Sequence, residues 1–267
     1  MALIGGCGAR LSGVVESVTF YVPSRQPFET PPSAEDVVFR GPSGATLHGW
    51  WLARNPATEP AGTVFFCHGN AGRLPDHLSF VEGLPDRGFD VFLFDYRGYG
   101  RSSPKRFLSR RSLLRDADRA LDALLARSPR VESPVILLGH SMGAVIGSAL
   151  IAERASDIDG AVLVAGFSSF PRVASDFGGP IGLALIQNGL DMEQSIARFG
   201  DVPAVIVHGG RDRVVRPYHA ERIAASAVEA GVATQTIVAP EADHVSIFDW
   251  RFGVEDTIAR FAEDLAR

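Results

Sequence analysis

A serine lies between an apolar run and a helical pattern, in the pentapeptide Gly139-His-Ser-Met-Gly143. The apolar residues 134–138 predict a buried strand, and the small and aliphatic residues 144–154 predict a helix. Ser141 therefore falls on a tight turn between strand and helix, where its hydroxyl points away from the sheet. The flanking glycines leave room for the neighbouring strand and helix. We predict that Ser141 is a nucleophile.

A serine hydroxyl is a poor nucleophile at neutral pH, so a base and an orienting carboxylate must lie nearby. In open α/β sheets, such groups come from loops at the carboxyl ends of strands. Asp212 follows the predicted strand 203–207 in a glycine-rich loop, and His244 follows the predicted strand 234–239. We predict Asp212 as the acid and His244 as the base, because the chain order Ser, Asp, His is the one expected for this architecture.

Other histidines and carboxylates compete for these roles. His219 also follows Asp212, but it lies a few residues into a predicted helix, where we expect a solvated surface side chain. Asp243 is adjacent to His244, and neighbours in a loop rarely aim their side chains at each other, so Asp212 is preferred to Asp243 and Glu241. The histidines expected to pack or hydrogen-bond near the site are His68, His140 and His208.

The negative charge that develops on an attacked carbonyl oxygen requires hydrogen-bond donors. We expect one backbone N–H from Met142, the residue after the nucleophile, and one from the loop after an earlier strand. The loop His68-Gly-Asn-Ala-Gly72 follows the predicted strand 63–67, and its glycines let the backbone turn its amides inward. Asn70 is the predicted second donor of this oxyanion hole.

Apolar strands alternate with helical patterns along most of the chain, which predicts a mainly parallel α/β sheet with helices on both faces. The first two of eight expected strands form an antiparallel hairpin at the N-terminal edge. The predicted strands are residues 36–40, 46–53, 63–67, 90–94, 134–138, 160–165, 203–207 and 234–239. The predicted helices are residues 74–87, 109–127, 142–154, 217–230 and 248–266.

We expect residues 1–267 to form a single domain. Residues 1–32 predict a lead-in segment over the domain surface, pinned by the rings of Phe20, Tyr21 and Phe28. Residues 166–202 are longer and more apolar than a crossover helix requires, so they form either a small lid over the site or an ordinary helix with a long loop. The side chains there that favour an apolar acyl group, if they face inward, are Phe177, Leu183, Leu185 and Ile186.

The charge balance excludes several classes of function. A net charge of −5 and a pI of about 5.8 argue against nucleic-acid binding. Asp116, Asp118 and Asp122 interleave with a basic run that begins at Lys105, which predicts a solvated helix face. Lys105 is the only lysine and lies in a polar loop, so we expect no Schiff-base or pyridoxal-phosphate chemistry.

Cys7 and Cys67 belong to no disulfide framework and to no cluster with metal-ligand spacing, so we predict neither a cofactor nor a metal. No run approaches the ~20 apolar residues that cross a bilayer. The N-terminus lacks the charged region of a secretory signal, although Ile4-Gly-Gly-Cys7 faintly resembles a lipoprotein cleavage box. We expect a cytoplasmic protein, and attachment to a membrane through the N-terminal segment is the alternative.

Five motifs together resemble the α/β-hydrolase superfamily, in the serine-aminopeptidase-like branch that includes monoacylglycerol lipases and membrane-anchored acyl-protein thioesterases. The matching segments are His68-Gly-Asn-Ala-Gly72, Asp95-Tyr-Arg-Gly-Tyr-Gly-Arg-Ser102, Gly139-His-Ser-Met-Gly143, His208-Gly-Gly-Arg-Asp212 and Asp243-His244. Each motif follows its proper predicted strand, and the resemblance spans nearly the whole chain. It implies a structural role for Asp95 and Arg97, which would tie down their loop near the turn that carries the serine.

These observations predict a serine hydrolase that cleaves a small-molecule carboxylic ester or thioester through an acyl-enzyme. The alternatives are a serine aminopeptidase or amidase on the same fold, and a binding protein without catalysis. An aminopeptidase needs a carboxylate near the pocket to hold the amino group of its substrate. The candidates within residues 166–202 are Asp176, Asp191 and Glu193. No oligomeric state is predicted.

Overall fold

The computed structural model describes residues 17, 21–128, 133–185 and 190–267. Its centre is an eight-stranded sheet with the strand order β10-β9-β8-β7-β4-β6-β3-β2. The strands are β2 (Glu35–Arg40), β3 (Thr46–Leu52), β4 (Gly62–Cys67), β6 (Phe89–Asp95), β7 (Val135–His140), β8 (Gly160–Val164), β9 (Ala204–Gly209) and β10 (Thr234–Ala239). The strands from β10 to β6 pair in parallel, and β3 pairs antiparallel with both β6 and β2. The predicted sheet and its antiparallel edge hairpin are confirmed.

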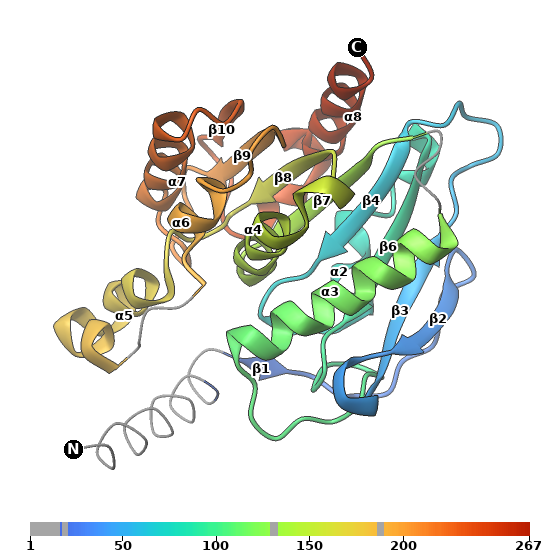
Figure 1. The fold of residues 1–267 in the computed structure, drawn as a ribbon, viewed down its shortest axis with the longest axis horizontal. Helices are drawn as coiled ribbons and strands as arrows, with labels where there is room; N and C mark the ends of the chain where they lie inside the picture. Colours follow the sequence, from blue (N-terminus) through green and yellow to red (C-terminus); the bar gives the residue numbers. More distant parts are fainter. Residues whose placement is uncertain (1–16, 18–20, 129–132, 186–189) are drawn as a thin grey trace.

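The central strands are buried along their whole length because helices cover both faces of the sheet (Figure 1). Successive side chains of a strand point to opposite faces, so Phe65 of β4 packs in one core cluster and Phe66 in the other. The helices on the first face are α3 (Arg110–Arg127), α4 (Met142–Arg154), α6 (Met192–Ile196) and α7 (Tyr218–Glu229). The helices on the second face are α2 (Leu74–His77) and α8 (Val254–Leu265).

The single helix expected over residues 74–87 is wrong. The structure has the short helix α2, followed by 3₁₀ turns at Leu78–Phe80 and Pro85–Arg87. A continuous helix through Pro85 would lose the hydrogen bond of the proline nitrogen, and the proline ring would clash with the carbonyl of Val81. The regular helix therefore ends before the proline.

The predicted helix 248–266 begins later than expected. Gly253 adopts a left-handed φ of 63° and separates α8 from a 3₁₀ turn at Trp250–Phe252. A left-handed residue cannot continue a right-handed helix, so α8 starts at Val254. Across the described residues, the helices are all too short or too polar to span a bilayer.

The sequence pattern predicted a solvated face for the charged run on α3, but part of this run is buried. Arg111 and Arg115 are exposed, but Asp116 is fully buried. Its carboxylate accepts hydrogen bonds from the backbone N–H and the Nε of Arg97, at 3.0 and 2.7 Å. Burial raises the pKa of Asp116 to about 6, although the bonds with Arg97 oppose this shift. Arg97 therefore anchors its loop to α3, and Asp95 at the start of that loop is also fully buried.

The lead-in segment runs beside the loop that follows β4. The short strand β1 (Val22–Pro23) pairs in parallel with β5 (Ala71–Gly72). Tyr21 is buried, and the ring of Phe28 packs edge-on against Trp50 with their centroids 5.5 Å apart. These two rings pin the segment as predicted.

Residues 166–202 contain α5 (Phe170–Leu185) and α6. α5 is kinked at Gly179, where φ is 55°, and it extends beyond the end of the sheet (Figure 1). Several positions named from the sequence lie outside the described residues, namely Phe20, Ile186 and the N-terminal segment from Ile4 to Cys7, as do the side chains of Leu183 and Leu185.

Candidate active site

Ser141 occupies the turn between β7 and α4. Its φ of 55° and ψ of −117° lie outside the regions that L-residues prefer, at a cost of roughly 1–3 kcal/mol. A Cβ at Gly139 would lie 2.6 Å from Ala144 Cα, and a Cβ at Gly143 would overlap the carbonyl oxygen of Cys67. Close packing of β7 and α4 against β4 therefore requires both glycines, and the strained turn presents Ser141 to a cavity.

His244 connects Ser141 to a buried carboxylate. Its Nε2 lies 3.1 Å from Ser141 Oγ, and its Nδ1 lies 2.7 Å from Asp212 Oδ2. A carboxylate only accepts hydrogen bonds, so Nδ1 carries the proton and donates it to Asp212. When the ring is neutral, Nε2 carries no proton and accepts the hydroxyl proton of Ser141. The structure brings these three residues together, with the histidine tautomer that general-base chemistry requires.

Backbone amides fix the carboxylate of Asp212. Its Oδ1 accepts the N–H groups of Val214 and Val215, each at 2.8 Å, in the loop after β9. His208, near the end of β9, donates from Nε2 to the carbonyl oxygen of Val215 at 2.9 Å. Burial lowers the pKa of His208, which keeps the ring a neutral donor. The carboxylate is thus oriented toward His244 by its own loop.

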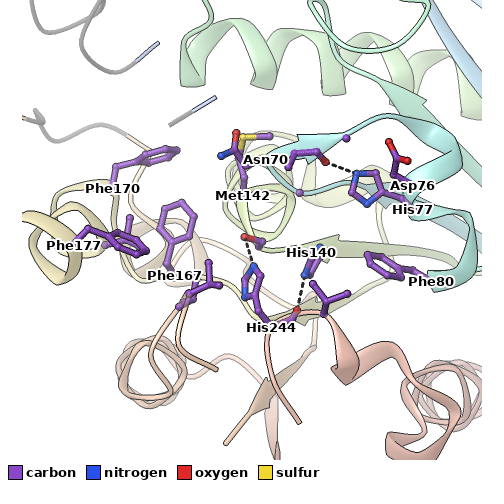
Figure 2. A pocket seen from close by; sticks show the side chains of 18 residues that line it. Asn70, Asp76, His77, Phe80, His140, Met142, Phe167, Phe170, Phe177 and His244 are labelled. Atoms are coloured by element: carbon purple, nitrogen blue, oxygen red, sulfur yellow. Dashed lines mark hydrogen bonds between the residues drawn. The ribbon is translucent and has the colours of Figure 1, made fainter. Parts of the chain in front are cut away.

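His140 holds His244 from the other side. Its Nε2 donates to the backbone carbonyl oxygen of His244 at 3.1 Å (Figure 2). Its ring packs edge-on against Phe80 and Phe248, with centroids 5.3 and 5.1 Å apart. Burial, followed by the charge of His244, keeps the pKa of His140 well below its usual value. His140 both packs and hydrogen-bonds near the site, as predicted.

The two predicted oxyanion donors line the same cavity as Ser141. Met142 is the first residue of α4, so its N–H has no acceptor within the helix. Asn70 lies in the loop after β4, and its side chain is engaged elsewhere, because Oδ1 accepts the N–H of Val22 at 3.2 Å. The oxygen of the Asn70 side chain is thus bound to the lead-in segment, and the backbone amide of Asn70 is the donor that the sequence predicted.

The cavity beside Ser141 has a volume of about 390 Å³ and two unlike ends (Figure 2). The walls at the α5 end are the apolar side chains of Phe167, Phe170, Val173 and Phe177. The walls at the α2 end are Asp76, His77 and Phe80. His244 lies between the two ends in Figure 2, and its Nε2 is 3.1 Å from Ser141 Oγ, so a bound molecule with one apolar and one polar part would place its junction near the serine.

The rival carboxylates near His244 bind other groups and not its imidazole. Asp243 accepts the backbone N–H groups of Val245 and Ser246, at 3.0 and 2.8 Å, and so closes its own turn. Glu241 pairs with Arg211 at the surface. Only Asp212, of the three carboxylates considered, bonds the imidazole of His244.

The carboxylates considered for an amino-group site also have partners. Asp176 accepts a hydrogen bond from His219, Asp191 caps α6, and Glu193 pairs with arginines. None of these three lines the cavity beside Ser141. Asp76 does line it, and sequence reasoning missed this residue. Its position directly behind the glycine-rich loop after β4 was the available signal.

His219 is fully buried, so the expected solvated side chain is wrong. Its Nδ1 accepts the backbone N–H of Ser168 at 3.2 Å and lies 2.9 Å from Ser168 Oγ. Its Nε2 lies 3.0 Å from Asp176 Oδ2. The first turn of α7 faces the loop between β8 and α5, and that loop covers the ring. We call this group the Ser168 array, and Ser141, His244 and Asp212 the Ser141 array.

Cys67 is a small buried residue, as expected, and burial raises the pKa of its thiol to about 12. In residues 17, 21–128, 133–185 and 190–267, no group of three or more His, Cys, Asp and Glu side chains is arranged to hold a metal ion.

The chain has relatives in bacteria and plants. Residues 58–178 match the family described as Serine aminopeptidase, S33. The chain is 32% identical over 238 residues to YfhR of Escherichia coli strain K12, which covers 88% of this chain and 82% of YfhR. It is 28% identical over 141 residues to the alpha/beta hydrolase domain-containing protein WAV2 of Arabidopsis thaliana, which covers 52% of this chain and 45% of WAV2.

The fold is similar to that of the Pyrococcus furiosus esterase Pf2001, with a TM-score of 0.73 and 17% identity, over 91% of this chain and 98% of the esterase. A mainly parallel sheet with a serine on a strand-to-helix turn defines a hydrolase of the α/β type. The chain belongs to the α/β-hydrolase family, as its motifs predicted.

Proposed function

We propose that the chain is a serine hydrolase that cleaves carboxylic esters or thioesters through an acyl-enzyme intermediate. The observation that carries the proposal is the hydrogen-bonded chain from Ser141 Oγ through His244 to Asp212, at the wall of a cavity. In this proposal Ser141 is the nucleophile, His244 the base and Asp212 the orienting acid. The backbone N–H groups of Met142 and Asn70 bind the oxyanion.

In the first half of the reaction, His244 Nε2 accepts the proton of Ser141 as Oγ attacks the acyl carbon. Asp212 stabilises the resulting imidazolium and keeps Nε2 directed at the serine. The amides of Met142 and Asn70 donate to the oxyanion, and the loss of one such donor typically costs ~10²–10³ in rate. The imidazolium then protonates the leaving alcohol or thiol as its bond to the acyl carbon breaks. In the second half, water attacks the acyl-serine by the same route and releases the acid.

The apolar wall at the α5 end supports an apolar acyl group. Phe167 and Phe170 are buried there, and Phe177 is 68% exposed at the mouth. Ligand cavities commonly measure about 300–1,000 Å³, so a volume of about 390 Å³ favours a short acyl chain. We place residues 166–202 as a small lid within a single domain, because α5 supplies this wall.

A second candidate is cleavage of an amide with a free amino group nearby. One observation favours it, namely the carboxylate of Asp76 in the cavity wall at the α2 end. That carboxylate lies 3.3 Å from Arg73 Nε, so the arginine competes for it with any substrate ammonium group. The ester therefore remains the first proposal. Turnover of an aminoacyl p-nitroanilide faster than that of an acyl p-nitrophenyl ester would reverse this order.

The test replaces the proposed nucleophile. Ser141→Ala should lower hydrolysis of p-nitrophenyl butyrate by at least ~10⁴-fold and abolish labelling by a fluorophosphonate, while the circular dichroism spectrum is retained. Ser168→Ala is the matched control, since it removes the hydroxyl of the other array and should keep both signals. Most of the activity surviving in Ser141→Ala would contradict the proposal, and absence of labelling in the unaltered protein would favour a binding protein.

A further inference from the structure

Buried side chains hold the loop after β4 by its carbonyl groups. Three successive carbonyl oxygens in this loop each accept a hydrogen bond from a different ring. The bonds run from His68 Nδ1 to Gly69 O at 2.7 Å, from the Tyr99 hydroxyl to Asn70 O at 2.8 Å, and from His77 Nε2 to Ala71 O at 2.9 Å. Figure 2 draws the last of these bonds. We call His68, Tyr99 and His77 the carbonyl clamp.

The clamp determines where the Asn70 amide points. In a planar trans peptide the C=O and N–H bonds are antiparallel. The Gly69 carbonyl and the Asn70 N–H belong to the same peptide unit, so the bond from His68 that draws the carbonyl into the protein turns the N–H the opposite way. The bond from Tyr99 fixes the peptide unit on the other side of the Asn70 Cα. Both planes that flank Asn70 are therefore held.

The clamp donors are rigid and have single, defined protons. Burial lowers the pKa of both His68 and His77, so each ring is neutral and carries one N–H. Because a carbonyl only accepts, that proton lies on Nδ1 of His68 and on Nε2 of His77. The two rings stack with their centroids 4.9 Å apart, and Tyr99 packs edge-on against His68 at 5.2 Å.

We propose that His68, Tyr99 and His77 are positioning residues that hold the Asn70 N–H toward the oxyanion. This inference rests on the proposed function. His68 and Tyr99 do not line the cavity, so they act through the loop and not on the substrate. Oxyanion donors accelerate a reaction because they are oriented before charge develops. A loop that loses one clamp bond should therefore bind the ground state as before and the transition state less well.

The test removes one hydroxyl and leaves its ring. Tyr99→Phe should lower kcat for p-nitrophenyl butyrate by ~10-fold, a part of the ~10²–10³ that a missing donor costs, with KM unchanged. The inhibition constant of an alkyl trifluoromethyl ketone, which forms a tetrahedral adduct with the serine, should rise by a similar factor. Tyr96→Phe is the matched control, because Tyr96 is equally buried and packs against His68 but bonds none of the three carbonyls. It should change neither constant.

A second pair of variants tests the clamp if Tyr99→Phe does not fold. His68 lies outside the cavity wall, so His68→Asn, which keeps a donor near Nδ1, should keep most of kcat, whereas His68→Leu should lower kcat as Tyr99→Phe does. Equal kcat and inhibitor affinity in Tyr99→Phe and Tyr96→Phe, or equal loss in the two His68 variants, would overturn the clamp alone. Absence of Ser141-dependent hydrolysis in the unaltered protein would overturn the proposed function, and the clamp with it.

Discussion

The described part of the chain contains two arrays of a serine, a histidine and an aspartate, and the two histidines turn opposite ring nitrogens toward the serine. In the Ser141 array the histidine Nδ1 faces the aspartate at 2.7 Å and Nε2 faces the serine at 3.1 Å. In the Ser168 array Nδ1 faces the serine Oγ at 2.9 Å and Nε2 faces the aspartate at 3.0 Å. Residue types and distances are nearly the same, so they do not distinguish the two arrays.

The surroundings of the two serines differ. Ser141 lies on a strained turn, lines a cavity and precedes the free N–H of a helix. Ser168 is fully buried, outside the wall of that cavity, and its own backbone N–H also bonds the histidine. Of these two hydroxyls, only that of Ser141 faces a cavity that could hold a substrate. We therefore propose that access and oxyanion donors, more than the three side chains, distinguish a nucleophilic serine from a structural one.

The Ser168 array has a different use in the fold. Asp176 comes from α5, His219 from α7 and Ser168 from the loop after β8. Tyr218 adds a hydrogen bond to Asp176 at 3.2 Å. The array therefore ties the segment that forms the apolar cavity wall to the body of the domain.

The largest expected difference between the arrays concerns their aspartates. Asp212→Asn should lower kcat by ~10⁴-fold, because an amide in place of the carboxylate favours the wrong tautomer of His244. Asp176→Asn should change kcat by less than about threefold, since His219 does not contact Ser141. Steady-state rates with p-nitrophenyl butyrate measure both. A loss of more than ~10²-fold in Asp176→Asn would break the comparison by showing that the buried array also serves the chemistry.

The next difference concerns stability and its dependence on pH. His219→Gln keeps a donor toward Asp176 but loses the acceptor for Ser168, so it should lower the unfolding free energy by about 1–3 kcal/mol at pH 8. Chemical denaturation measures this change.

The loss should shrink as the pH falls. Burial lowers the pKa of His219, although Asp176 opposes this and His208 and Arg172 add to it. Below about pH 6.5 the histidine takes up a proton in the unfolded chain but not in the folded one, so acidification lowers the unfolding free energy of the unaltered protein. The glutamine variant has no histidine at this position and does not undergo this loss of stability. A loss that grows between pH 8 and pH 5.5 would contradict a neutral buried ring.

The smallest expected effect sharpens the comparison between the serines. Ser168→Ala removes one buried hydroxyl but leaves the backbone N–H bond to His219, so it should cost about 0.5–1.5 kcal/mol of stability and leave kcat within about twofold. Thermal unfolding at pH 8 measures the first effect, and the ester assay the second. Unchanged stability would mean that the hydroxyl adds nothing to the array.

Local pattern predicted the sheet and the position of the serine because both follow from short stretches of sequence. The apolar run before Ser141 and the two flanking glycines reflect packing that involves the nearest elements. Asp212 and His244 could be named because parallel strands present their following loops at one edge of the sheet. The proline that breaks the helix expected over residues 74–87 was visible in the sequence, so that error was avoidable.

Two further errors, at Asp116 and His219, concern side chains whose partners are distant in the chain. Asp116 is buried because Arg97 reaches it from another loop, and no spacing rule encodes that pair. His219 is buried because the loop at Ser168 covers it, 51 residues earlier in the sequence. The bond of the carbonyl clamp at Tyr99 also joins distant residues, 29 positions apart in the chain. Such contacts are set by tertiary packing, which the hydrophobic period of a single segment does not report.

The place of β10 has a consequence for how the protein is made. Among the described strands, β10 is the last in the sequence and pairs with β9 at the edge of the sheet, and His244 follows it, 103 residues after Ser141. Ribosomes add about 5–20 residues per second, so Ser141 is synthesised about 5–20 s before His244. During that interval the nascent chain has no imidazole beside Ser141, so under the proposed mechanism we expect ester hydrolysis only after β10 has docked.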